Sequence, residues 1–247
     1  MNVLAIGNSF SQDAFAYLHQ VAEGAGVDLT CLGLYIGGCP LSLHAENIRT
    51  GASAYLYQKN GDDGWDHYIS IPDALDECEW DVVSLQQVSH DSGLYETYLP
   101  YLDEVADFVR AKRPGAKLVV HKTWAYETDS QHGGFANYDR DQNKMYESLC
   151  DAYRQAAERL GATIIPVGDV IQTLRRTPAY DYANGGPSLC RDGFHLSIPH
   201  GRYAAALTWF AALTGKSATT TAYAPEGVSE EEAEFLKKTV DSVVFGA

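Results

Sequence analysis

The chain has 247 residues, 45% of them hydrophobic and 21% charged, which is enough for one α/β domain with a sizeable core. Its 18 basic and 33 acidic residues give a formal net charge of −15, which disfavours binding to nucleic acid or to an anionic membrane surface. The chain starts on a strand-like segment, and no apolar run approaches the ~18 residues that span a bilayer. We therefore expect one cytoplasmic domain over residues 1–247, with neither nucleic acid nor a membrane as partner.

Five short apolar runs, each bounded by Gly, Pro or polar residues, predict β-strands. They are Asn2–Ile6, Leu29–Ile36, Asp81–Gln86, Lys117–Trp124 and Thr163–Val167. Apolar spacings of three and four predict helices between and after them, over Phe15–Ala25, Tyr98–Ala111, Gln142–Leu160 and Arg202–Leu213. This alternation is typical of βαβ units, so we expect an α/β fold with a five-stranded parallel sheet covered on both faces.

Residues 52–71 interrupt the alternation. Two aromatic-rich stretches, Tyr55–Tyr57 and His67–Ile69, flank the turn-rich segment Lys59–Gly64. This pattern predicts a β-hairpin excursion from the core. The sequence leaves open whether the hairpin walls a pocket or lies as a flap in solvent.

The residues suited to chemistry stand near opposite ends of the chain. The first predicted strand runs into Gly7-Asn8-Ser9, which places a hydroxyl at the carboxyl edge of the sheet, where open α/β folds bind ligands. Far along the chain, Asp192 and His195 are three residues apart on a turn that we expect to open a short helix. Such a carboxylate can accept from one imidazole nitrogen while the other faces the serine. The pattern predicts a nucleophilic serine hydrolase; a phosphate-binding turn at residues 7–9 and a helix-capping role for Asp192 are the structural alternatives.

A nucleophilic serine also needs hydrogen-bond donors for the oxyanion that develops on the substrate. We expect the backbone N–H of Ser9 to be one donor and that of Gly38, just after the second strand, to be another. Gln86 or Gln87, at the end of the third strand, would supply the third through a side-chain amide. Strand alternation allows only one of the two to face a given side, and the sequence does not say which.

These segments resemble the SGNH, or GDSL-like, hydrolase superfamily. Its motifs are a Ser after the first strand, a Gly after the second, an Asn after the third and a late Asp-x-x-His, and the matches here are Gly7–Ser11, Gly38 and Asp192–His195. The family Asn has no counterpart, since Gln86 and Gln87 stand in its place. The resemblance implies a three-layer, flavodoxin-like sandwich and a Ser-His-Asp triad of Ser9, His195 and Asp192, with no metal or organic cofactor.

Nearly the whole chain is similar to one branch of that superfamily, which is catalogued as a domain of unknown function and is common in gut bacteria. The segments that carry this similarity are Ile6–Ala14, Leu34–His44, Trp80–Ser89, His121–Tyr126, Tyr138–Tyr146 and Arg191–Trp209. The resemblance implies carbohydrate or acyl esters as substrates.

Four further residues are candidates for contact with the substrate. His121, Trp124 and Tyr126 follow the fourth strand and suit a wall for a sugar or acyl group, and His44 follows the second. We expect hydrolysis of an ester, with an O-acetyl group on a carbohydrate as the favoured substrate. The alternatives are acyl transfer to an alcohol, or a protein that binds carbohydrate or acts as a sensor without catalysis. The oligomeric state is left open.

Overall fold

The computed structural model describes residues 1–62 and 67–246, and within them seven strands form one sheet in the order β4-β3-β2-β1-β5-β6-β7. The strands are β1 (Asn2–Gly7), β2 (Thr30–Tyr35), β3 (Tyr55–Lys59), β4 (Tyr68–Ile69), β5 (Val82–Leu85), β6 (Lys117–His121) and β7 (Thr163–Ile165).

Strands β2, β1, β5, β6 and β7, which are adjacent in that order, are parallel, as predicted. The central strand β1 pairs with β2 on one side and β5 on the other, and its residues Val3–Ile6 are almost completely buried. Strands β6 and β7 are shorter than the sequence predicts. Strand β6 stops at His121, and β7 stops before Pro166, which has no N–H to continue the ladder.

The predicted hairpin is an extension of the sheet rather than an excursion from it. Strand β3 pairs antiparallel with β2, and β4 pairs antiparallel with β3. The Tyr55 and Ile69 side chains are buried, which fixes the register of both strands. Part of the predicted turn, including Gly64, lies outside the described residues.

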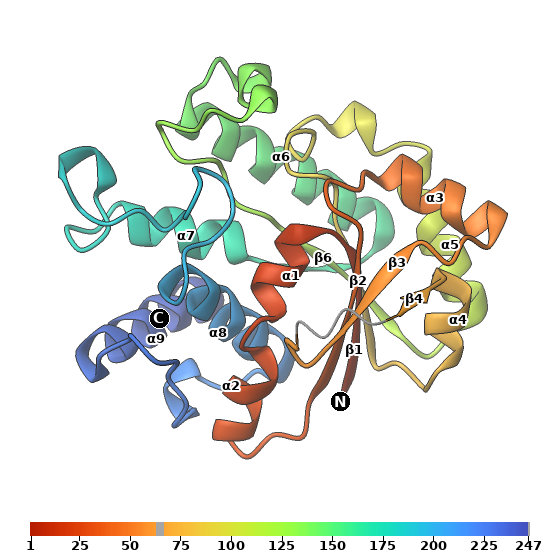
Figure 1. Cartoon of the computed structure of the whole chain (residues 1–247), viewed down its shortest axis with the longest axis horizontal. Helices are drawn as coiled ribbons and strands as arrows, with labels where there is room; N and C mark the ends of the chain where they lie inside the picture. Colours follow the sequence, from red (N-terminus) through yellow and green to blue (C-terminus); the bar gives the residue numbers. More distant parts are fainter. Residues whose placement is uncertain (63–66, 247) are drawn as a thin grey trace.

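Helices cover both faces of the sheet and make three layers (Figure 1). On one face pack α1 (Ser9–Phe15), α2 (Leu18–Gly24), α7 (Val167–Arg175), α8 (His200–Thr214) and α9 (Glu230–Phe245). On the other lie α3 (Leu41–Thr50), α4 (Ile71–Asp76), α5 (Tyr101–Lys112) and α6 (Gln142–Leu160). Between them the described residues also form the 3-10 turns η1 (Tyr95–Thr97), η2 (Gly133–Tyr138), η3 (Tyr182–Asn184) and η4 (Ala218–Thr220). This is the expected sandwich.

Helix α8 lies at the centre of its layer, in contact with α1, α2, α7 and α9. Its side chains from Tyr203 to Ala211 are buried, so the helix is apolar around its whole circumference. None of the helices in the described ranges is both long and apolar enough for a membrane crossing.

Candidate active site

Ser9 stands at the first position of α1, directly after β1. The Asn8 side chain accepts from the N–H of Phe10 at 3.1 Å, while Ser11 Oγ accepts from the N–H of Asn8 at 3.1 Å, so the helix begins with a reciprocal cap. A Cβ at position 7 would lie 2.3 Å from Ser11 Oγ, so the sharp turn needs Gly7. The turn presents the Ser9 hydroxyl at the carboxyl edge of the sheet.

Ser9, His195 and Asp192 form a continuous hydrogen-bonded chain. His195 Nε2 lies 2.9 Å from Ser9 Oγ, and His195 Nδ1 lies 2.7 Å from Asp192 Oδ2. The other Asp192 oxygen accepts from the backbone N–H groups of Phe194 and His195. Partial burial opposes ionisation of Asp192, but the hydrogen bonds from the His195 ring and from these two N–H groups hold the pKa of its carboxyl below its usual value.

The helix expected at Asp192–His195 is not there. These residues form a loop closed by a bridge between Cys190 and Leu196, and α8 begins only at His200. The turn needs a left-handed residue, which Gly193 supplies with φ +86°. Asp192 therefore caps its own turn rather than a helix, and the same carboxylate holds the His195 ring.

Asp13 fastens this loop, hereafter the His195 loop (residues 190–196), to α1. Its carboxylate is fully buried, accepts from the N–H of Leu196 at 2.8 Å and binds Arg191 Nη1 at 3.0 and 3.1 Å. Arg202 Nε, from α8, donates to the same carboxylate at 2.8 Å. Ser9 and Asp13 are four residues apart, so one turn of helix carries both the hydroxyl and the anchor of the imidazole that faces it.

A pocket of about 320 Å³ opens over Ser9 and His195. Gly38 lines it with φ +65°, and its N–H has no acceptor within the part of the chain that the structure describes. The N–H of Ser9 belongs to the first turn of α1, where N–H groups lack an intrahelical acceptor. Ser9 and Gly38, the residues expected to supply backbone donors, therefore line the same pocket.

Neither glutamine at the end of β5 lines this pocket. Gln86 is 2% exposed; its Nε2 donates to Asn8 Oδ1 at 2.8 Å, and its Oε1 lies 2.8 Å from His121 Nδ1. Gln87 Oε1 accepts from two backbone N–H groups, and its Nε2 donates to the carbonyl and hydroxyl of Thr97. Both amide groups bond to other parts of the fold, so the expectation that one of them is the third oxyanion donor is wrong. The two side chains instead hold together the segments around the site.

The four side chains expected to touch substrate are all 0% exposed, which corrects that expectation. Trp124 stacks on Phe10 with ring centroids 4.2 Å apart and donates to the carbonyl of Phe194, so it packs beneath the His195 loop. Tyr126 bonds to the Ser89 hydroxyl at 2.8 Å.

The two histidines of that set also point into the core, His44 from α3 and His121 from the end of β6. His44 Nδ1 bonds to the Tyr55 hydroxyl at 2.8 Å, and His121 bonds to Gln86. Burial lowers the pKa of each imidazole to about 3, so both are neutral near pH 7.

Other residues line the pocket instead. Besides Ser9, Gly38 and His195 they are Tyr35, Gly37, Val88, Ser89, His90, His132 and Phe194. Phe194 stands inside the Asp-x-x-His motif, and Val88, Ser89 and His90 directly follow the glutamines, so motif neighbours were the available signal. The signal for His132 was weaker, because a histidine in the Gly-containing stretch Ser130–Gly134 suits the protein surface as well as substrate contact.

His132 offers a third donor in the pocket. Its Nδ1 accepts from the N–H of Gly134 at 3.1 Å, which leaves the proton of the neutral ring on Nε2. The ring stacks on His90 and meets Phe194 edge-on. Burial, with the neighbouring His90 and His195, lowers the pKa of His132 and favours this neutral form.

In the described ranges, no group of three or more His, Cys, Asp or Glu side chains is placed to hold a metal ion. The cysteines in these ranges are free thiols.

The whole chain matches one family and shares its fold with ester hydrolases. A family model described as Domain of unknown function (DUF4886) matches residues 2–242. A DUF4886 family protein from Bacteroides uniformis is 40% identical over 100% of this chain and 95% of its own, with a TM-score of 0.92.

A protein from Slackia heliotrinireducens, proposed to be an SGNH hydrolase, is 23% identical over 86% of this chain and 98% of its own, with a TM-score of 0.59. A mutant acetyl-xylooligosaccharide esterase from Geobacillus stearmophilus is 13% identical over 86% and 91%, with a TM-score of 0.51. None of the curated proteins matches the chain.

Proposed function

Because the chain belongs to the DUF4886 family and has the fold of the SGNH hydrolases, we propose that it is a serine esterase that acts through Ser9, His195 and Asp192. The observation that carries the proposal is the hydrogen-bonded chain from Ser9 Oγ through both nitrogens of His195 to Asp192. Such a chain provides a nucleophile, a base and a group that orients the base.

The reaction would run in two halves. His195 Nε2 takes the proton as Ser9 Oγ bonds to the ester carbonyl carbon, and Asp192 stabilises the imidazolium that forms. The N–H groups of Ser9 and Gly38, with His132 Nε2–H, would hold the oxyanion. When the bond to the alcohol oxygen breaks, His195 returns the proton to the leaving alcohol; water activated by the same imidazole then releases the acid and frees Ser9.

The pocket supports a small acyl group on a hydroxylated partner. Its volume of about 320 Å³ is near the lower end of the range for ligand pockets. Tyr35 and Phe194 provide apolar ring surface, while Ser89, His90 and His132 provide hydrogen-bonding groups. An O-acetyl ester of a carbohydrate has this mixture of properties, and the acetyl-xylooligosaccharide esterase noted above uses the same fold. We propose acetylated sugars as the substrate class.

The test is a panel of aryl esters of increasing acyl length, together with acetylated sugars. We expect turnover of the acetyl esters, and a fall of at least about 10⁴-fold in kcat for Ser9→Ala, the order of loss for a nucleophile that acts as part of a triad. Ser242→Ala, which removes a hydroxyl from the exposed side of α9, is the matched control and should keep full activity.

Two results would contradict the proposal. One is equal turnover by the wild type and Ser9→Ala. The other is absence of turnover together with sugar binding that survives Ser9→Ala, which would instead indicate a binding or sensor protein. Product analysis with competing alcohols separates hydrolysis from acyl transfer, because a transferase would pass the acyl group to the alcohol.

A further inference from the structure

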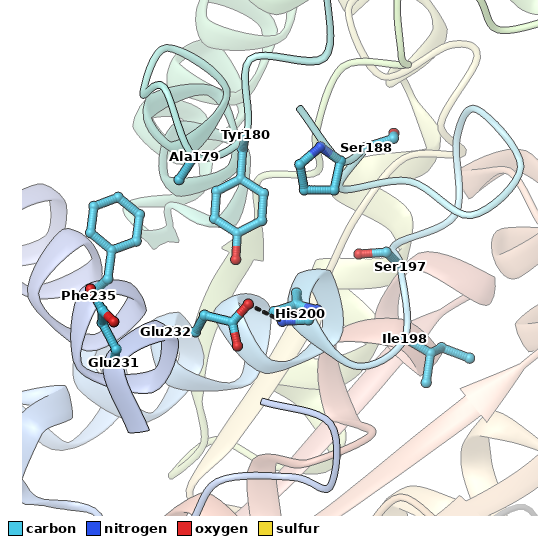
Figure 2. Close-up of a pocket in the computed structure, with 10 residues that line it drawn as sticks. Ala179, Tyr180, Ser188, Ser197, Ile198, His200, Glu231, Glu232 and Phe235 are labelled. Atoms are coloured by element: carbon cyan, nitrogen blue, oxygen red, sulfur yellow. Dashed lines mark ion pairs between the residues drawn. The ribbon is translucent and has the colours of Figure 1, made fainter. Parts of the chain in front are cut away.

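A second cavity, of about 490 Å³, lies beyond the His195 loop and is larger than the pocket over Ser9. Three parts of the chain enclose it (Figure 2): the segment after α7 with Tyr180, the start of α9 with Glu231 and Glu232, and the stretch from Ser197 to His200 that leads from the loop into α8. None of the proposed catalytic residues lines this cavity.

Tyr180 carries an unpartnered hydroxyl into this cavity. The residue is 5% exposed, and in the described part of the chain its hydroxyl makes no hydrogen bond. Figure 2 shows the hydroxyl pointing toward Glu232 and His200. The hydroxyl is therefore free to donate to, and accept from, a molecule that enters the cavity.

Glu232 and His200 add polar groups of complementary kinds. His200 Nε2 faces Glu232 Oε1 at 3.3 Å, but it is buried and lacks hydrogen-bond geometry. The other oxygen of Glu232 accepts from the N–H and hydroxyl of Ser229 and is fixed by them. One oxygen of Glu232 and the Tyr180 phenol therefore face the same space, and the His200 ring lies beside the carboxylate.

Apolar side chains make up much of the remaining lining, beside Ser188, Ser197 and Glu231. Ile198 is 57% exposed, and Phe235 lies beside Tyr180 with ring centroids 6.4 Å apart and 24° between the planes. A sugar ring has apolar C–H faces and a rim of hydroxyls that both donate and accept, which matches apolar side chains beside a carboxylate and a phenol. The carboxylates of Glu231 and Glu232 disfavour anionic sugars and phosphate.

We propose that the cavity between Tyr180, Glu232 and Ile198 is a second binding site that holds a neutral sugar ring without catalysis. Its occupant meets Ser197 and Ile198, which follow His195 by only two and three residues. A chain of sugars bound there is held beside the esterase site while a separate part of the carbohydrate reaches Ser9. The binding itself does not depend on the chemistry proposed for Ser9.

Binding is measured on Ser9→Ala protein by calorimetry and ligand-observed NMR, with neutral xylo-, cello-, manno- and galacto-trisaccharides as probes. We expect at least one to bind, with Tyr180→Phe weakening it by about 3- to 10-fold, the effect of one lost hydrogen bond. Ile198→Asp changes an exposed side chain and should abolish binding while the protein stays folded. Tyr182→Phe is the matched control and should bind as well as the parent, because Tyr182 lies outside this cavity and its hydroxyl bonds to Asp129.

A second arm separates this site from the one over Ser9. Wild-type protein whose Ser9 has been blocked with a fluorophosphonate should still bind the sugar. If the reagent fails to label Ser9, the esterase proposal fails and the sugar measurements on Ser9→Ala still stand. The second site is overturned if none of the neutral sugars binds, if anionic sugars bind in preference, if Ile198→Asp and Tyr180→Phe bind as the parent does, or if blocking Ser9 abolishes binding.

Discussion

Asp13 is the residue on which the geometry of the proposed active site depends most, although it touches no substrate pocket. Its buried carboxylate meets Arg191, Arg202 and the N–H of Leu196, and so ties both ends of the His195 loop to the helix of Ser9. A buried carboxylate with two guanidinium partners is stable only because both partners are present. Asp13 therefore acts through His195 as a positioning residue.

We predict that Asp13→Asn lowers kcat by about 10- to 100-fold with little change in KM, because displacement of a catalytic group by about 1 Å costs on that order. The amide keeps the volume of the carboxylate but cannot accept from three donors. Steady-state kinetics well below the unfolding temperature measure this. Asp107→Asn, on a side chain that is 74% exposed, is the control. An unchanged kcat, or a change in KM alone, would show that Asp13 does not hold His195 in place.

The place of Ser9 could be predicted because parallel strands bring their carboxyl ends to one edge. Its contact with Asp192 and His195, which follow no strand, could be predicted only from the Asp-x-x-His spacing and the family resemblance. The direction of individual side chains could not. Gln86 and Trp124 stand at strand ends, as catalytic and binding residues do, yet both point into the core. Alternation along a strand fixes which side chains share a face, but not which face borders the pocket. For Gln86, the hydrogen bond to the buried Asn8 side chain holds the amide in the core.

At the scale of elements, the parallel strands and the longer helices could be predicted because their patterns are long and regular. Four helices were missed: α3, α4, α7 and α9. Helix α4 has only six residues, and α7 starts directly after Pro166 where a strand was expected to continue. The predicted helix Phe15–Ala25 contains α2 and only the last residue of α1, which begins at Ser9 because Asn8 caps it.

Helix α9 begins with a run of acidic residues that looks like a solvated segment. Ser229 and Glu232 form a reciprocal cap there. The carboxylates of the first turn lie at the positive end of the helix dipole and are stabilised by it. Leu236 and Val240 are buried beneath. The same cap orients Glu232 toward the second cavity, so the start of this helix has a structural and a proposed binding role.

We predict that Ser229→Ala lowers the free energy of unfolding by about 1 kcal/mol, the usual cost of losing an N-cap side chain. Urea unfolding measures it. Ser242→Ala, in the last turn of the same helix, removes a hydroxyl that bonds only to the carbonyl of Thr239 and should cost less than half as much. Equal losses in the two variants would mean that the cap contributes nothing specific.

At the scale of the molecule, the sheet is sealed between two helical layers, and this sealing buries ionisable groups whose charge the core cannot solvate. His44 and His121 are each 0% exposed, and each has one ring nitrogen without a partner in the described ranges. They come from opposite sides of the central strand, through α3 and β6. Burial therefore favours the neutral form of both rings and lowers the pKa of each.

We predict that the free energy of unfolding falls as the pH drops below about 6.5. The pKa of each buried imidazole is about 3, below its ordinary value, so between these values the unfolded chain binds protons that the folded chain does not. Each histidine then lowers the free energy of unfolding by up to ~1.4 kcal/mol per pH unit, and has little effect above about pH 7.5. Urea unfolding at pH 7.5, 6.0, 5.5 and 5.0 measures the slope of the free energy of unfolding against pH.

His121→Gln and His44→Gln should each make this slope shallower, relative to their own stability at pH 7.5, and the double variant should make it shallowest. A double variant with the wild-type slope would assign the acid sensitivity to carboxylates instead.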